Sequence, residues 1–537
     1  MESGRDEMKN RGKRIVELCT ASFFVVCVIV PILSMLGRIT PEGFRSVLGS
    51  PQFWPAVWNS VSTAFTAASI SVVLSLLAAW CVERTQMKGK ALFSVLFVLP
   101  MLIPSISHAL GLVTLFGRNG LLTNLFHMDG SIYGFWGIVA GSVMYSFPVS
   151  FLMFSSILQY EDGTAYQAAE VLGIPPVRRF TGLTLPYLKK TLISAFFALF
   201  TMIVTDYGVP LMVRGKRITL SVLMYDKAVS MMDHDAGSVI GALLLLPAVV
   251  AFLVDLLNRE KGRSGFLTQT VVPKRRRGPD ALAGVFCTLL GICVLAPIAS
   301  FGIMTFAAKY PVDTTFTLYH IQKALNRGAG GYLLWSMLYS VLAALFGTAM
   351  AFCCAYLTAR VKGRFSKGLH LVSITSMAIP GIVLGLSYVI FFHGSALYGT
   401  IFIVVLADSI HFFASPYLMM YNTLGKIDPE LEAVGQCLGV GRLRIIRDVI
   451  LPKVRGTVYE MFGYFFVNSM MTISAVSFLV PPSPKPVALM INQFESQLLM
   501  ESAAFVSLLI LAVNIALKVA VSGAKRARFP LRAKART

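Results

Sequence analysis

Long apolar runs recur along almost the whole chain, and they restrict the folds that it can adopt. Each run has about 20 residues or more, which is enough for a helix to cross the hydrocarbon core of a bilayer. About 12 such runs lie at residues 16–36, 57–82, 91–116, 135–158, 191–213, 237–257, 282–307, 333–358, 369–392, 399–421, 457–480 and 502–521. The sequence therefore predicts an all-α polytopic membrane protein with about 12 transmembrane helices.

Composition excludes the main alternatives to this class. Of the 537 residues, 56% are hydrophobic and only 14% are charged, too few to cover a soluble surface. The apolar runs do not alternate with polar residues, which argues against a membrane β-barrel. The eight cysteines form no CxxC pair, so neither a zinc site nor a disulfide framework is expected.

A polar segment that interrupts the runs occurs twice. Tyr166–Pro186 reads YQAAEVLGIPPVRRFTGLTLP, and Glu432–Pro452 reads EAVGQCLGVGRLRIIRDVILP. The glycines of the two Leu-Gly pairs are separated by the same interval as the prolines of the two Leu-Pro pairs. We call this separation the repeat interval. An ordinary loop would not recur with both glycine and proline in place.

Paired prolines extend the repeat into the apolar runs. Pro104 pairs with Pro380 and Pro148 with Pro416, in both cases at a separation slightly longer than the repeat interval. We interpret the chain as two tandem six-helix halves, which share one orientation because six is even. The expected divisions are a first half at 1–257, a basic cytoplasmic linker at 258–280 and a second half at 281–537.

Lysine and arginine predict the orientation. With the N-terminus inside, the cytoplasmic segments hold 35 of these residues and the outside loops hold 11. This asymmetry predicts that both termini, and both copies of the polar segment, are cytoplasmic. It also explains the formal charge of +21 through topology and lipid headgroups, without a nucleic-acid partner.

Each polar segment has the features of a short helix followed by a turn. Helix formers precede Gly173 and Gly439, which can take the left-handed conformation that ends a helix. Pro186 and Pro452 are expected near the start of the helix that becomes the next span. Such a helix at the membrane surface can insert into a groove of a soluble partner.

The pattern Glu-Ala-Ala-x-x-x-Gly, then nine residues, then Ile-x-Leu-Pro resembles the signature loop of binding-protein-dependent ABC importer permeases. The chain is similar over nearly its whole length to the fused two-half permeases of the ferric iron, thiamine and aminoethylphosphonate group. In that family the loop forms a coupling helix in a cleft of the ATP-binding subunit. The residues implied for coupling are Gln167, Ala168, Ala169, Gly173 and Pro186 in the first copy, and Glu432, Ala433, Val434, Gly435, Gly439 and Pro452 in the second. The usual Glu is Gln167 in the first copy, and the second copy is degenerate.

The resemblance implies the partners and the location. These are two cytoplasmic ABC ATPase subunits, a periplasmic solute-binding protein and the lipid of a bacterial inner membrane. The chain is expected to be no enzyme and to hold no cofactor, with ATP and Mg on the partner subunits. In agreement, the runs GKRIT and GKIDP lack the spacing of a phosphate-binding loop.

The solute expected first is ferric iron, because TDYGVP and ISAVSF look most like the iron group. Thiamine, aminoethylphosphonate and another small anion remain open. A 12-helix secondary transporter is the alternative from another class. It would explain the duplication but not the paired coupling motifs.

Candidates for the translocation path are prolines that would kink or break spans, and intramembrane polar residues. They are Pro104, Pro148, Pro380, Pro416, Asp408, His411 and Asp206. For Asp408 and His411, an interhelical hydrogen bond is the competing reading, and Asp206 is a candidate contact of an outer gate. The sequence shows no cluster suited to ferric iron, and no metal site is predicted. Asp233-His234-Asp235 is read as a solvated loop.

Overall fold

A computed structural model describes residues 16–127, 131–258, 271, 273, 275–361, 363–479 and 485–527. Most of the expected linker, 258–280, lies outside these residues. Almost all of the regular secondary structure in the described chain is helical, and its one sheet is a two-stranded antiparallel hairpin.

The first half begins with one long helix, Val16–Leu36, which includes η1 and α2, and continues with a series of further helices. Their bounds are η1 Val25–Ile29, α2 Val30–Leu36, α3 Pro41–Leu48, α4 Phe53–Arg84, α5 Lys90–Val98, η2 Leu99–Leu102, α6 Ser105–Phe116, α7 Leu121–Leu125, α8 Phe135–Gln159, α9 Thr164–Val171, α10 Pro176–Arg179, η3 Phe180–Thr184, α11 Leu185–Thr205, α12 Gly208–Val213, α13 Leu220–Tyr225, η4 Asp226–Ser230 and α14 His234–Asn258.

The second half follows a closely related order and adds the hairpin after its first helix. The bounds are α15 Arg277–Phe306, β1 Ala307–Lys309, β2 Asp313–Phe316, α16 Tyr319–Asn326, α17 Ala329–Arg360, α18 Arg364–Thr375, η5 Ser376–Ala378, α19 Gly381–Phe392, α20 Ile401–His411, α21 Ala414–Gly425, α22 Glu430–Cys437, α23 Arg442–Ile445, η6 Ile446–Ile450, α24 Leu451–Met471, α25 Val487–Ser496 and α26 Met500–Ala527.

Within the described residues, eight helices are long and apolar enough to cross a membrane, and three bent helix pairs bring the total to at most eleven. The all-α polytopic prediction is confirmed, but a total of twelve is not. Helix α24 occupies most of the eleventh expected run, 457–480, yet it is not among the eleven. Arg455, Glu460 and Asn468 make it less apolar than the other spans.

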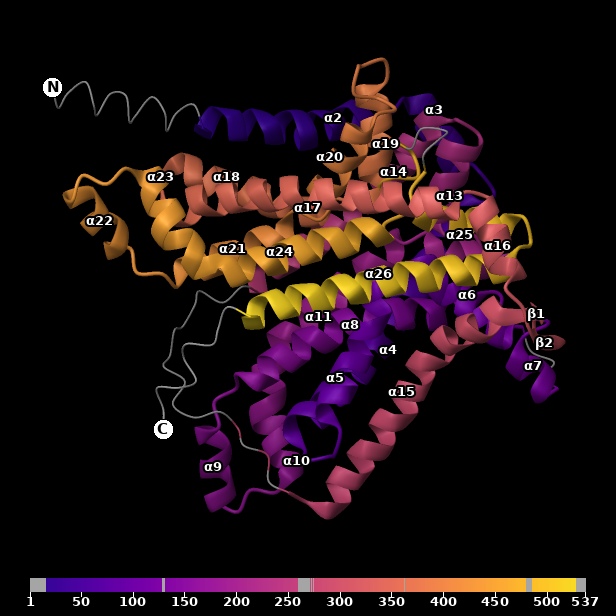
Figure 1. Ribbon diagram of the computed structural model, residues 1–537, viewed down its shortest axis with the longest axis horizontal. Coiled ribbons are helices and arrows are strands. Elements are labelled where there is room, and N and C mark those ends of the chain that lie inside the picture. Colours follow the sequence, from indigo (N-terminus) through magenta and orange to yellow (C-terminus); the bar gives the residue numbers. More distant parts are fainter. Residues whose placement is uncertain are drawn as a thin grey trace.

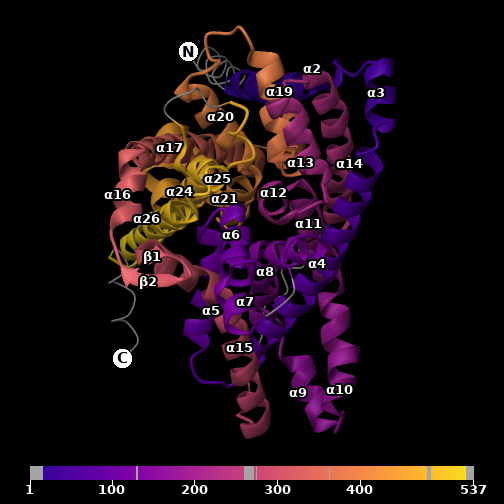
Figure 2. The ribbon, with the colours of Figure 1, turned by 90° about the vertical axis from the view of Figure 1, so that its right-hand side faces the viewer.

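The first span of each half packs against the other half. In the first exchange, α2 packs on α19, and the hydroxyl of Tyr388 donates to the carbonyl of Cys27 at 2.6 Å. In the second, α15 packs on α6, where the hydroxyls of Thr114 and Ser300 lie 2.7 Å apart. Figure 2 shows α2 beside α19. Each third span is therefore covered by the first span of the other half.

Small side chains let the longest helices approach closely. Helix α4 buries a series of alanines and serines against α8, and the hydroxyls of Ser71 and Ser146 hydrogen-bond at 2.8 Å. Helix α17 packs in the same way on α24, where Gly347 lies under the ring of Phe465. Close backbone contact and buried hydroxyl pairs are typical of helix packing in lipid.

The polar repeats lie at one end of the molecule. In Figure 1, α9 and α22 are both on the left, where the N-terminal helix begins and α26 ends. Helices α3, α7 and α16 and the hairpin β1–β2 lie at the opposite end. The spans therefore connect an end that carries the repeated helices to an end made of short helices and a hairpin.

Candidate coupling and translocation sites

The two repeated helices have the same length and the same C-terminal cap. Helices α9 and α22 have eight residues each. Gly173 and Gly439 follow them with φ of 66° and 71°. The amide of Ile174 donates to the carbonyl of Ala169 at 3.0 Å, and Val440 donates to Gly435 at 2.8 Å. This is a Schellman cap in both copies, and it requires a left-handed residue at the glycine.

The motif residues divide into exposed and packed positions. Gln167 and Ala168 are exposed on α9, as are Ala433 and Val434 on α22, whereas Ala169 is buried. Gly435 is packed, since a Cβ there would lie 2.5 Å from Cδ1 of Ile445. The glycine that makes the second copy look degenerate therefore has a local packing reason.

Large apolar side chains are exposed at equivalent positions of the two copies. Leu172 and Leu438, separated by the repeat interval, are 75% and 74% exposed. Val177 and Leu443, at the same interval, are 74% and 83% exposed. Exposed apolar residues that recur beside a polar helix mark a surface that a partner can cover.

Pro186 and Pro452 lie in the first turn of α11 and α24, as expected, but neither proline marks a new start of helical structure. The helix that contains Pro186 runs without interruption from Val177 to Thr205. A five-residue π turn, η3 or η6, precedes the proline in each copy. Proline has no amide hydrogen for a bond to residue i−4, and the wider π turn accommodates it inside a continuous helix.

A buried ion pair fixes the entry to α9. Arg84, the last residue of α4, pairs with Glu161, and their side chains are only 7% and 5% exposed. The hydroxyl of Tyr166 on α9 donates to Oε1 of the same carboxylate at 2.7 Å. Burial, reinforced by the Glu161 carboxylate, raises the pKa of Tyr166, so its phenol keeps the proton that it donates. We call Arg84, Glu161 and Tyr166 the first cluster.

An equivalent group fixes α22 itself. Arg360, the last residue of α17, pairs with Glu432 at 2.9 Å, and the side chains are 6% and 15% exposed. The hydroxyl of Tyr356 donates to Glu432 at 3.1 Å. Arg360 also donates to the carbonyls of Ile427 at 2.7 Å and Asp428 at 3.0 Å. We call Arg360, Glu432 and Tyr356 the second cluster.

The prolines differ in what they do to the spans. Pro104 and Pro380 stand at the sharpest breaks, where successive helices turn by 104° and 107°. Pro416 follows a bend of 55° between α20 and α21. Pro148, by contrast, does not break its span, because α8 continues through it as one helix.

The halves meet just after the ends of α11 and α24. The hydroxyl of Tyr207 hydrogen-bonds that of Ser477, and it lies 3.4 Å from the carbonyl of Ile473, its own repeat equivalent. Two close contacts beside this junction are reciprocal. A Cβ on Gly208 would lie 2.5 Å from Oγ of Ser105, and one on Gly381 would lie 2.4 Å from Oγ of Ser474. Gly208 is the repeat equivalent of Ser474, and Ser105 is that of Gly381. Each contact therefore pairs one glycine with one serine, and the two residue types have exchanged positions between the halves.

The intramembrane polar residues occupy different surroundings. Ser469 of α24 donates to the buried carboxylate of Asp408, which joins α20 to α24. His411 lies next to Gly381, with Nε2 3.0 Å from the position of an added Cβ. The carboxylate of Asp206 accepts from the amide of Val209 at 2.9 Å.

Side chains from both halves approach one another beside Asp206, and the sequence did not reveal this. Tyr145 of α8 lies within electrostatic range of Asp206 and of Tyr464 of α24. The ring of His108 lies 6.1 Å from that of Tyr145, and its buried Nε2 has no hydrogen-bond partner among the residues that the structure describes. Tyr145, Asp206 and Tyr464 all retain partial solvent accessibility. In the described part of the chain, no three His, Cys, Asp or Glu side chains form a metal-binding group. The group of Tyr145, Asp206, Tyr464 and His108 therefore differs from an ordinary metal-binding group in having two tyrosines.

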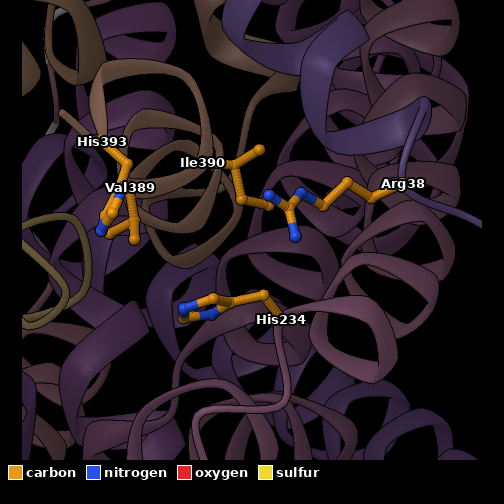
Figure 3. A pocket seen from close by; sticks show the side chains of 5 residues that line it. All are labelled: Arg38, His234, Val389, Ile390 and His393. Carbon is orange, nitrogen blue, oxygen red and sulfur yellow. The ribbon is translucent and has the colours of Figure 1, made fainter. Parts of the chain in front are cut away.

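A pocket of about 130 Å³ opens at the end opposite to α9 and α22. Figure 3 shows Arg38 and His393 extending from opposite sides above His234. Asp235 pairs loosely with Arg38 at 3.6 Å, and Asp233 caps α14 through the amide of Ala236 at 2.9 Å. The run Asp233-His234-Asp235 is therefore a helix start rather than a set of converging ligands.

The sequence matches the family described as binding-protein-dependent transport system inner membrane component over residues 71–260 and 344–523. It is 25% identical to the ferric transport system permease protein FbpB of Actinobacillus pleuropneumoniae, with 88% of this chain and 72% of that protein covered. It is 23% identical to a putative ferric transport system permease protein FbpB 1 of Haemophilus influenzae, with 86% and 77% covered. It is 26% identical to the thiamine transport system permease protein ThiP of Brucella suis, over 46% of each chain. A solved bacterial alginate ABC transporter aligns with a TM-score of 0.41 and 17% identity, over 50% of this chain and 99% of that one.

Proposed function

Because the chain belongs to the family of inner membrane components of binding-protein-dependent transport systems, we propose that it is the permease of a ferric iron importer. A periplasmic protein delivers the iron, and two cytoplasmic ATPase subunits supply the energy. In this arrangement both chain termini lie in the cytoplasm of a bacterial cell. The observation that carries the proposal is the pair of identically capped helices, α9 and α22, at one end of the molecule.

The exposed apolar residues support an ATPase partner at these helices. Leu172 and Leu438 project from equivalent positions, so two copies of one subunit could cover them in the same way. Each helix enters a groove of its subunit, and the Schellman cap keeps its C-terminal end in a fixed shape. Closure of the two subunits on ATP then moves both helices together.

The junction between the halves supports a gate. Tyr207, Ile473 and Ser477 join repeat-equivalent segments of the two halves. Movement of one half relative to the other separates these segments and opens the path from one side of the membrane at a time. The sharp breaks at Pro104 and Pro380 place short helices beside the junction.

Ferric iron is favoured over thiamine by two observations. The relatives matched over most of this chain bear ferric transport names. The cluster of Tyr145, Asp206, Tyr464 and His108 offers phenol, carboxylate and imidazole groups, which suit a hard trivalent cation during passage.

The test is uptake of radioactive ferric iron into proteoliposomes that contain the permease, its ATPase and its binding protein. Uptake should require ATP, persist with a protonophore and resist competition by excess thiamine. Tyr145→Phe should lower iron uptake about tenfold, which corresponds to about 1.4 kcal/mol. Tyr310→Phe, which removes a phenol that donates to Thr114 at 3.0 Å, is the control. Uptake that stops with the protonophore, or thiamine uptake without iron uptake, would contradict the proposal.

A further inference from the structure

The first cluster joins α9 to the end of the long helix α4, and the second cluster joins α22 to the end of α17. We propose that these clusters transmit the movement of α9 and α22 to α4 and α17, and that Glu161 and Glu432 are positioning residues for energy coupling. The inference rests on the proposed function, since it assumes that a partner moves the two helices.

Their place in the fold suits transmission. Arg84 and Arg360 are the last residues of two helices of 32 residues each. These helices pack along α8 and α24, which carry Tyr145 and Tyr464. A displacement of either arginine therefore moves an element that reaches the membrane interior.

Burial makes these ion pairs stiff. The four charged side chains are at most 15% exposed. By contrast, the neighbouring pair Arg447–Asp448 is 86% and 51% exposed. Charges shielded from water interact more strongly, whereas exposed pairs contribute little. The shared tyrosine hydroxyl occupies the second oxygen of each carboxylate and restricts its rotation.

The repeat provides an independent reason to assign a function. Tyr166 and Glu432 are equivalent positions, separated by the repeat interval, and each is the third residue of its motif helix. The first half places the phenol there and takes its carboxylate from Glu161. The second half places the carboxylate there and takes its phenol from Tyr356. An arginine–carboxylate–tyrosine group is thus present in both halves, with its arginine at equivalent positions and its carboxylate and tyrosine at different ones.

The assignment also changes the role expected for Glu432. The family resemblance implied a contact with the ATPase. Its carboxylate instead faces Arg360 and Tyr356 inside the permease. The partner surface is left to exposed residues such as Ala433 and Val434 on α22 and Leu438, which follows it.

The first experiment needs no partner. Hydrogen–deuterium exchange of the purified full chain should show faster exchange in 164–171 for Glu161→Gln, by about fivefold or more, with 430–437 unchanged. Glu432→Gln should give the reverse pattern. Glu460→Gln, which weakens the exposed pair with Lys525, should change neither segment. Unchanged exchange of 164–171 and 430–437 in both variants would overturn the proposal.

The second experiment measures coupling in the complete transporter. Glu161→Gln should lower ATPase stimulation by the iron-loaded binding protein about fivefold while the ATPase still co-purifies. The triple variant Trp80→Tyr, Glu161→Gln, Tyr166→Glu rebuilds the second cluster in the first half and should recover most of the stimulation. Trp80 and Tyr356 are equivalent, because they are separated by the same interval as Arg84 and Arg360.

The outcomes separate this inference from the proposed function. If the unmodified complex shows no ATP-dependent iron uptake, the proposed function fails. If that complex transports iron and Glu161→Gln and Glu432→Gln both keep full stimulation, only the role of the clusters fails. If Glu161→Gln does not fold, Arg84→Lys replaces it, because it keeps the charge and loses the paired guanidinium geometry.

Discussion

Arg84 and Arg360 are equivalent residues that end equivalent helices, yet they are held differently. Arg84 pairs with Glu161 and lies over the ring of Tyr166 at 5.9 Å. Arg360 pairs with Glu432 and also donates to the carbonyls of Ile427 and Asp428. The second arginine therefore keeps acceptors when its carboxylate is removed.

This difference predicts unequal losses of stability. Glu161→Ala leaves a buried guanidinium without its counter-charge, a change that costs roughly 3–5 kcal/mol in comparable sites. Glu432→Ala should cost less, because two carbonyls still accept from Arg360. Thermal unfolding of the two purified variants gives the comparison. A melting temperature that falls as far for Glu432→Ala as for Glu161→Ala would contradict this explanation.

The helix caps predict a requirement for glycine that depends on backbone conformation and not on space. No atom of the described residues lies within 4 Å of a Cβ added to Gly173 or Gly439, but both glycines have positive φ. Alanine there should cost about 1–2 kcal/mol at each site and loosen the end of the helix. Asparagine, which tolerates this conformation, should be milder.

The measurement is retention of the ATPase on the immobilised permease. Gly173→Ala and Gly439→Ala should each weaken retention, and the double variant should weaken it further. Gly182→Ala is the matched control, because its surroundings are equally open and its φ is not positive. Equal retention in the double variant and the control would show that the caps do not shape the partner surface.

The exchanged glycine and serine at the junction predict a rescue. Gly208→Ser alone would crowd Ser105 and the side chain of Ile473, and overpacking of this kind costs about 1–3 kcal/mol. Adding Ser105→Gly would recreate the arrangement that Gly381 and Ser474 already have. Iron uptake should fall in the single variant and recover in the double one. Failure to recover, with normal insertion of both proteins, would mean that the two contacts are not equivalent.

Features that depend on the spacing of residues along the chain and on their backbone preferences could be predicted from the sequence alone. The tandem repeat, the helix–glycine segment and the breaks at Pro104 and Pro380 all follow from spacing and backbone preferences. The expectations were wrong or incomplete where the surrounding helix decides the outcome. Pro148 sits within a helix that continues through it, and a π turn before Pro186 joins α10 to α11 in one continuous helix.

Contacts between distant residues could not be predicted. The residues that interact with Tyr145 come from α6, from the end of α11 and from α24. No periodicity relates Tyr145 to Tyr464, because these tyrosines do not occupy equivalent positions of the repeat. For the same reason the ion pair of Glu432 with Arg360, which joins residues far apart in the sequence, could not be predicted.

We propose that α9 and α22 are two equivalent cytoplasmic sites for the ATPase, and Cys437 allows a direct test of this placement. This exposed thiol on α22 is equivalent to Val171 on α9, which is 88% exposed. A membrane-impermeant maleimide should label Cys437, and the cysteine of Val171→Cys in a Cys437→Ala background, only in inverted vesicles. Bound ATPase should protect both positions. Labelling of either thiol in intact cells, or full labelling in the presence of bound ATPase, would contradict the account.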